Sequence, residues 1–269
     1  MKEKVWINIS IKYKENLEDW NEFFSYESED NDGKIIAYSF YTGSKEYVRF
    51  IKYLKEKNIY YYIFRRVYTF TKKEKDNAEI LRFWTDNDAK DSYVMDSLDN
   101  VCNKCGKGLP FLTRKRLHVD YKSIRKHDIM STYNGGIETI ISERLRKIFI
   151  QEGITGVKFE PIYQLGKENN IIEGFYHLVL REGIGDIVEP SIINKKGLCP
   201  KCGFYDEFIC QTILNFNRNT WEGLDICYTK NWFGGPPKFK RVIISNKLYK
   251  VLVENKIKNV YFQPAYFVD

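Results

Sequence analysis

The chain has 269 residues, of which 43% are hydrophobic and 16% aromatic, so it can bury a core as one large domain or two ordinary ones. No apolar run approaches the roughly 18 to 20 residues of a membrane-spanning helix, and the start lacks the apolar stretch of a signal peptide. These features exclude the transmembrane class and predict a cytoplasmic protein with no membrane partner. The formal net charge is +7, and much of the positive excess lies between residues 102 and 163.

The N-terminal third, residues 1–100, has the patterns of an α/β region. Alternating apolar residues predict a strand with one buried face, namely Val5, Ile7, Ile9 and Ile11. Ser44 is suited to cap a helix over residues 44–58, and the aromatic and β-branched residues 60–71 predict a second strand. The acidic residues 26–33 predict a loop, and the Asp- and Asn-rich residues 85–99 predict a boundary.

The remainder of the chain contains an internal repeat. Residues 141–163 align without gaps on residues 244–266, and nine of the 23 aligned positions are identical. The identical pairs include Leu145 with Leu248, Phe159 with Phe262 and Pro161 with Pro264. Chance is a poor explanation, because several further apolar positions match in kind.

The same order of motifs recurs upstream of the aligned segments. Three short motifs of the first repeat each correspond to one in the second: Cys102–Gly106 to Cys199–Gly203, Asp128–Thr132 to Asp225–Thr229, and Gly135-Gly136 to Gly234-Gly235. The sequence therefore predicts an α+β fold with a first repeat over residues 101–165 and a second over residues 166–269. We expect the two pseudo-symmetric repeats to pack as one domain.

Each repeat is predicted to run from a cysteine knuckle to a helix and then a strand. Ser142 and Ser245 suit helix N-caps, and Gly153 suits the end of the first helix. The alternating apolar residues that follow predict a buried strand, and a proline in each marks a strand end or edge.

Four of the six cysteines form two Cys-x-x-Cys-Gly motifs, which we call knuckles. A knuckle lets two thiolates converge on one ion, and two knuckles make a closed tetrahedral site. The predicted ligands of one structural Zn²⁺ are Cys102, Cys105, Cys199 and Cys202. A thioredoxin-like redox pair and an iron–sulfur site are the alternatives, although two matched knuckles argue against redox chemistry.

The other reactive residue types do not form an enzyme motif. The sequence contains none of the metalloprotease, α/β-hydrolase or phosphate-loop motifs, so no catalytic residue is assigned and we expect no enzyme activity. Cys210 and Cys227 are predicted to be buried thiols. Asp128 and Asp225 recur without a recurring histidine beside them, which favours helix or turn capping over acid–base catalysis.

Residues 104–126 form a basic patch with a single acid, Asp120. Its cations are Lys104, Lys107, Arg114, Lys115, Arg116, Lys122, Arg125 and Lys126. A lysine-rich solvated surface explains the patch without a function, but it also suits an acidic protein or phosphates. A zinc-ribbon nucleic-acid-binding protein that uses residues 104–126 is therefore the alternative function.

In combination, the two knuckles, Asp128-Ile129 and residues 141–163 resemble the double-CXXCG motif proteins of bacteria, which look like immunity proteins of polymorphic toxin systems. The resemblance covers roughly residues 100–266. It implies a cytoplasmic protein that binds and neutralises a cognate toxin without catalysis, with the paired cysteines as metal ligands. Immunity proteins against nucleases are often acidic, whereas this chain is basic, so an acidic face on the toxin fits better.

Overall fold

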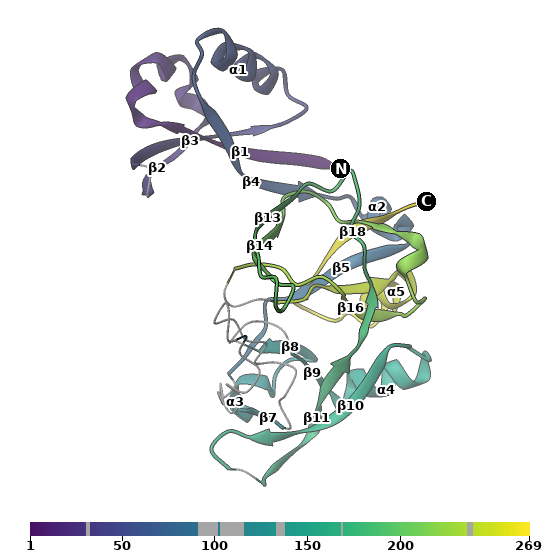
Figure 1. The fold of residues 1–269 in the computed structure, drawn as a ribbon. Helices are drawn as coiled ribbons and strands as arrows, with labels where there is room; N and C mark the ends of the chain where they lie inside the picture. The colour runs from purple at the N-terminus through teal and green to yellow at the C-terminus, as the bar shows by residue number, and fades with distance from the viewer. Residues whose placement is uncertain (31–32, 91–101, 103–115, 133–137, 168, 236–238) are drawn as a thin grey trace. The chain divides into compact units, whose positions relative to one another are not determined.

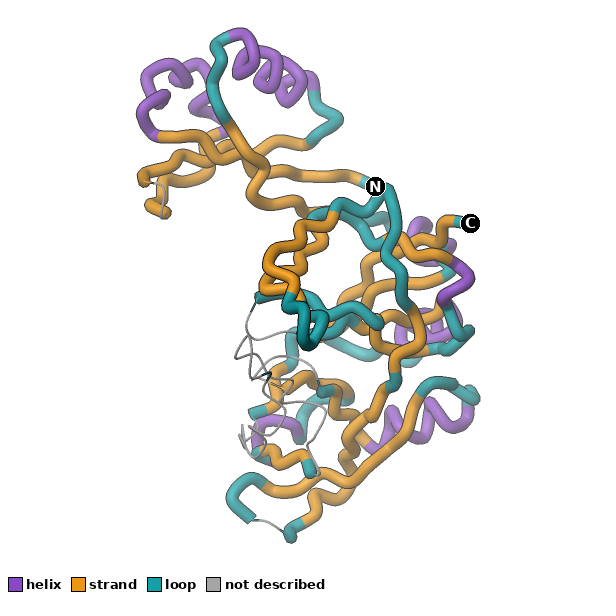
Figure 2. Tube along the Cα trace, in the orientation of Figure 1, coloured by secondary structure: helices purple, strands orange, loops and turns teal. Residues whose placement is uncertain are grey.

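A computed structural model describes residues 1–30, 33–90, 102, 116–132, 138–167, 169–235 and 239–269. The chain divides into two compact units, Met1–Glu74 and Lys75–Asp269. Both units are mixed α+β with mostly strands and few helices, as the predicted fold class requires (Figures 1 and 2). The boundary expected at residue 100 lies outside the described residues, and the division between the compact units comes earlier.

The first unit contains one antiparallel sheet in the order β2-β3-β1-β4. Its elements are β1 (Lys2–Ser10), the 3-10 helix η1 (Ile11–Phe23), β2 (Phe24–Asp30), β3 (Gly33–Tyr41), α1 (Lys45–Glu56) and β4 (Tyr61–Thr69). One face of the sheet packs against η1 and α1, because residues of β1, β3 and β4 share one hydrophobic cluster with residues of these helices. Val5 and Ile7 of β1 are fully buried there beside Leu17 of η1 and Phe50 of α1.

Four of the five expectations for the N-terminal third can be compared with this sheet. The first strand, the helix and the strand after residue 60 are confirmed, and the Ser44 side chain accepts a hydrogen bond from the N–H of Tyr47 as a cap should. The loop expected over residues 26–33 is wrong, because β2 pairs with β3 through Asp30↔Gly33. β2 is an edge strand, where acidic side chains are tolerated.

The second unit contains two six-stranded sheets and a two-stranded hairpin. The first sheet has the order β6-β8-β9-β11-β10-β7 and the second the order β12-β16-β17-β5-β18-β15. The strands of the first sheet are β6 (Asp88–Ala89), β7 (Leu117–Val119), β8 (Ile129–Thr132), β9 (Thr139–Ser142), β10 (Val157–Gln164) and β11 (Ile171–Leu180). Those of the second are β5 (Ile80–Thr85), β12 (Glu182–Ile184), β15 (Asn215–Asn217), β16 (Ile226–Thr229), β17 (Val242–Ser245) and β18 (Val260–Val268). The hairpin is β13 (Ile193–Leu198) and β14 (Tyr205–Cys210).

Helices connect and cover these sheets. They are α2 (Lys72–Asn77), α3 (Tyr121–Ile124), α4 (Glu143–Gln151), η3 (Arg218–Thr220) and α5 (Asn246–Glu254). α4 and α5 share one buried cluster with both six-stranded sheets, including Leu145 and Phe149 of α4 and Leu248 and Leu252 of α5. The two sheets therefore belong to one core.

Each six-stranded sheet contains one inner strand that pairs with strands distant from it in the sequence. In the second sheet, β5 lies between β17 and β18 and is antiparallel to both, with Leu81 opposite Ile244 and Pro264. In the first sheet, β11 lies between β9 and β10 and is antiparallel to both. Each sheet also has a parallel pair at either end: β6·β8 and β10·β7 in the first, β12·β16 and β15·β18 in the second.

The predicted helix and strand near the end of each repeat are present. Ser142 and Ser245 cap α4 and α5, and Gly153 has a left-handed φ of +58° just after α4. The prolines do not end the strands, because β10 continues past Pro161 and β18 past Pro264. β7 pairs with β10 only from Ile162 onward, and β15 pairs with β18 only from Tyr266 onward. Each proline lies before that point, where one side of its strand has no paired strand among the described residues.

Candidate metal centre

The turn of the β13–β14 hairpin holds the second knuckle. The hairpin closes at Leu198 opposite Tyr205, and the N–H of Cys199 donates to the carbonyl oxygen of Phe204 at 2.8 Å. The N–H of Gly203 donates to the carbonyl oxygen of Cys199 at 2.8 Å, and Gly203 has a left-handed φ of +73° that favours glycine. This tight turn explains why a knuckle ends in glycine.

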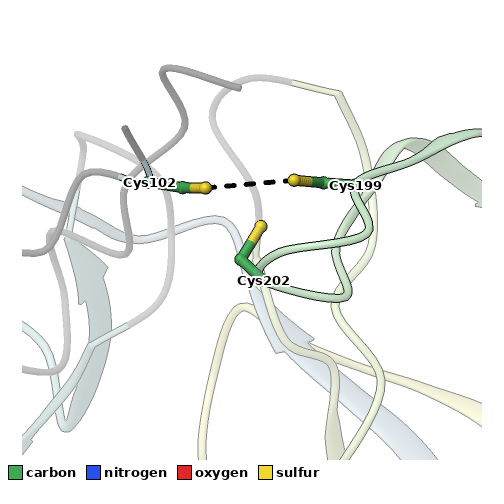
Figure 3. A group of neighbouring side chains, drawn as sticks. All are labelled: Cys102, Cys199 and Cys202. Atoms are coloured by element: carbon green, nitrogen blue, oxygen red, sulfur yellow. Dashed lines mark hydrogen bonds between the residues drawn. The ribbon is translucent and has the colours of Figure 1, made fainter. Parts of the chain in front are cut away.

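Three cysteine sulfurs converge at this turn (Figure 3). The Sγ atoms of Cys102 and Cys199 are 3.9 Å apart, although the residues are 97 positions apart in the sequence. The ligand atoms of Cys102, Cys199 and Cys202 all lie within 4.8 Å of one another. The part of the chain that the structure describes thus brings together three of the four predicted ligands, and Cys105 lies outside it.

The sulfur spacing fits a metal centre and not a disulfide. A disulfide requires an S–S distance of about 2.05 Å. Zinc–sulfur bonds of about 2.3 Å in a tetrahedron place two sulfurs about 3.8 Å apart, close to the 3.9 Å between Cys102 and Cys199. Cys199 is buried and the other two cysteines are half-buried. These three thiols can therefore hold a metal ion.

Aromatic and backbone contacts attach the hairpin to residues 232–234. The rings of Phe204 and Trp232 meet edge to face at 6.1 Å, and those of Phe208 and Phe233 do so at 5.3 Å. The Gly234 N–H also donates to the carbonyl oxygen of Phe208 at 2.9 Å. These contacts involve none of the three cysteines, and they pack the hairpin against residues 232–234.

A buried cation contributes to the same packing. The Lys240 side chain is only 4% exposed, forms an ion pair with Glu182 of β12, and places its Nζ 4.7 Å from the ring centre of Trp232. A cation held over an aromatic face and paired with a carboxylate is well compensated. Lys240 thus connects Trp232 to Glu182 of the second sheet.

The cavity beside the knuckle is small. Its volume is about 170 Å³, and it is lined by Gly203, Phe204, Tyr205, Phe208, Lys230, Asn231 and Trp232. Typical small-molecule pockets have volumes of about 300 to 1,000 Å³. This cavity is therefore too small for an ordinary substrate or cofactor.

The two repeated aspartates support the helix caps. Asp225 accepts a hydrogen bond from the Ser245 hydroxyl at 2.7 Å, while the serine accepts one from the N–H of Leu248. Asp128 accepts from the Ser142 hydroxyl at 2.8 Å in the same way. The aspartates were predicted to be caps, but the serine side chain caps each helix. The aspartate accepts a hydrogen bond from the serine hydroxyl and so orients the serine oxygen toward the helix N–H.

Other residues that the sequence analysis named are buried in the core or contact neighbouring side chains. Cys210 and Cys227 are buried thiols, as predicted, and burial raises the pKa of Cys227 to about 12. The Arg116 side chain donates to Asn169 at 3.0 Å and lies over the ring of Tyr163. The patch members Lys104, Lys107, Arg114 and Lys115 lie outside the described residues.

The comparisons with known proteins are negative: the sequence matches no protein-family model and no curated protein. Within the described residues, none of the helices has the length and apolar character needed to cross a membrane. The cysteine cluster and the fold therefore carry the functional argument.

Proposed function

We propose that this chain is an immunity protein, which binds a cognate bacterial toxin and blocks it without catalysis of its own. The observation that carries this proposal is the 3.9 Å approach of Cys102 to Cys199, because it brings sulfurs of both knuckles to one point. In combination with Asp128-Ile129 and residues 141–163, the paired knuckles carry the resemblance to double-CXXCG proteins. The proposed role for them is structural.

The proposed ion is Zn²⁺, with Cys105 as the fourth ligand beside Cys102, Cys199 and Cys202. Four thiolates are a donor set that zinc takes readily, and the sulfur spacing agrees with zinc–sulfur bonds. A closed four-cysteine site has no open position for water, so it would hold the scaffold together without hydrolysing a substrate.

We also propose that the second unit consists of two copies of one ancestral unit. The support is that β6, β8, β9, β10 and β7 occupy the same places in their sheet as β12, β16, β17, β18 and β15. The parallel and antiparallel pairs also correspond. The remaining place is filled by β11 in the first sheet and by β5 in the second. Along the chain β5 precedes β6 and β11 precedes β12, so β5 belongs to the first copy and β11 to the second. Each copy therefore contributes one strand to the sheet of the other, and the first copy begins at β5.

This arrangement suits a rigid binding protein. The exchanged strands make each sheet depend on both copies, and the zinc ion would join the two knuckles at another point. A preorganised surface binds with a smaller entropic cost than a flexible one. The positive charge of the chain favours a toxin that presents an acidic face.

The test of this function is protection against the toxin encoded beside this chain's gene. The tagged protein is purified from its native host and its stoichiometric partners are identified by mass spectrometry, and the adjacent toxin gene is then expressed with and without this chain. We expect a stable complex and restored growth, with protection lost in Cys199→Ser and kept in Cys210→Ser. Absence of both complex and protection, or recovery of nucleic acid alone, would overturn the proposal.

A further inference from the structure

β4 is an exposed edge strand with an unusual composition. Among the described strands it pairs only with β1, so its outer side has no strand partner. Large apolar side chains along it are exposed: Tyr60 just before it by 77%, Phe64 by 52%, Tyr62 by 40% and Val67 by 36%. Long hydrophobic edges invite pairing with other chains and are usually blunted or covered. β2, at the opposite edge, carries the exposed acids Glu27 and Glu29.

The sheet face beside β4 is rich in aromatic rings and cations. Residues directly opposite on paired strands share a face, and β1 and β4 place Lys4 with Val67, Trp6 with Arg65 and Asn8 with Tyr62. We call the surface formed by Lys4, Trp6, Tyr62, Arg65 and Val67, together with Tyr26 and Phe64, the open face, beneath which Asn8 is buried. It lies opposite the side of the sheet that η1 and α1 cover.

Contacts within the open face hold its rings and cations together. The Lys4 Nζ and the Arg65 guanidinium each lie 5.1 Å from the ring centre of Trp6. The rings of Tyr26 and Phe64 meet edge to face at 6.4 Å. The side chains that the structure describes on this face include no carboxylate. Its charge is therefore positive.

We propose that the β4 edge and the open face are the surface that docks the toxin, a proposal that rests on the immunity function. The partner adds an extended segment to the outer side of β4 by strand pairing and presents acidic side chains to Lys4 and Arg65. Strand addition supplies main-chain hydrogen bonds, and the aromatic side chains supply specificity. Trp, Tyr and Arg are the residue types that dominate binding energy at protein interfaces.

A protein partner suits this surface better than a nucleic acid. An unpaired strand edge offers alternating N–H and C=O groups, which match another polypeptide strand. Binding of single strands relies on ring faces that bases can stack on, and here the Trp6 ring is already engaged by two cations. The combination of edge, exposed apolar residues and unopposed cations favours an acidic peptide segment.

The test uses the full chain and the purified toxin that the protection experiment identifies. Two variants alter the surface at exposed positions: the double variant Phe64→Ser/Val67→Ser and the charge reversal Arg65→Glu. Val48→Ser is the matched control, because Val48 is 62% exposed on α1 of the same unit. Unchanged zinc content and thermal unfolding show that each variant folds.

We expect each surface variant to weaken toxin binding by at least about tenfold and Val48→Ser to leave it unchanged. Hydrogen exchange of the β4 amides should slow in the wild-type complex, since strand addition protects them. Wild-type affinity in both surface variants would overturn the docking surface and leave the immunity function standing. A wild-type chain that neither binds nor protects would overturn the immunity function, and the docking surface with it.

The same variants distinguish the toxin from two alternative partners of this surface, a nucleic acid and a second copy of the chain. Fluorescein-labelled oligo(U) that binds the wild type and is lost in Arg65→Glu, with toxin binding intact, would assign the surface to nucleic acid. A dimer in solution that Phe64→Ser/Val67→Ser dissociates, again with toxin binding intact, would assign β4 to pairing with a second copy. Either result would overturn the proposal.

Discussion

Asp225 shows how a single side chain connects segments that are distant in the sequence. Its carboxylate accepts hydrogen bonds from the Ser245 hydroxyl and from both the N–H and the hydroxyl of Thr155. Burial would raise the pKa of Asp225, but these hydrogen bonds and nearby Lys247 outweigh it and hold the pKa below its ordinary value. The ionised form is therefore the one that stabilises the fold.

Asp225→Ala should lower the free energy of unfolding by about 1 to 3 kcal/mol at pH 7, because the buried Ser245 hydroxyl and the two Thr155 donors lose their acceptor. Urea denaturation measures this loss. Asp128→Ala is the matched control, and we expect a smaller loss there because the Asp128 side chain is 28% exposed. An equal or larger effect at Asp128 would contradict the account.

The lowered pKa of Asp225 also predicts a dependence on pH. A carboxylate whose pKa is depressed on folding stabilises the protein above its unfolded pKa of about 3.9 and loses that contribution as pH falls through the folded pKa. Between pH 5 and pH 3, the wild type should therefore lose more stability than Asp225→Asn, measured as urea midpoints. Parallel curves for the two proteins would show that Asp225 does not titrate as described.

The proposed metal ligands give a third prediction at the scale of single residues. Cys199→Ser should lower the zinc content and the melting temperature, because it removes a buried ligand that the hairpin turn holds in place. Cys210→Ser changes a buried thiol of the same hairpin outside the cluster, and it should keep stoichiometric zinc. Zinc is measured by elemental analysis of the purified variants, and full retention in Cys199→Ser would be incompatible with the proposed site.

Much of this site could be predicted from the sequence, because cysteine has few roles and two matched knuckles favour a metal site over a redox pair. The sequence placed Cys102 beside Cys199 and Cys202 across 97 positions through the matched motifs alone. The contact between Asp225 and Thr155 could not be predicted, since no local spacing relates two residues 70 positions apart. The sequence indicated a cap and left its long-range partner unidentified.

At the scale of elements, β5 is the strand on which the second sheet depends. It lies between β17 and β18, and its residues Leu81 and Phe83 are buried in the cluster shared with α4 and α5. Its removal would expose both neighbouring strands and one side of the core. β5 therefore sets the N-terminal limit of a foldable second unit.

Two truncated chains test this dependence. Residues 75–269 should fold cooperatively and bind zinc, whereas residues 87–269, which lack β5, should unfold or aggregate. Circular dichroism during thermal unfolding and the elution volume on size exclusion report the difference. A cooperative melt of the shorter chain at the temperature of the longer one would refute the central role of β5.

The elements themselves were predictable to different extents. Ser142 and Ser245 begin α4 and α5 as expected, because caps and apolar periodicity are local signals. β2 was missed because its acidic residues are typical of a turn. It is a strand because it pairs with β3, and the local composition of residues 24–30 does not report that pairing. The insertion of β5 and β11 into their sheets depends on neighbours distant in the chain, which periodicity does not report.

At the scale of the whole molecule, the two compact units should respond differently to loss of metal. All six cysteines lie beyond residue 101, so every proposed ligand belongs to the second unit. Treatment with a strong chelator should speed hydrogen exchange in residues 193–210 and lower the melting temperature of the second unit. Exchange in residues 1–74 should be unchanged, and equal destabilisation of both units would contradict this division.

One zinc ion is proposed to join the two knuckles through four thiolates, and X-ray absorption at the zinc edge reports the number and type of its ligands. We expect one zinc per chain, with four sulfur ligands at about 2.3 Å and no light-atom ligand. A chain without zinc, or a zinc shell with two sulfurs and the remainder oxygen or nitrogen, would contradict the joint site of Cys102, Cys105, Cys199 and Cys202.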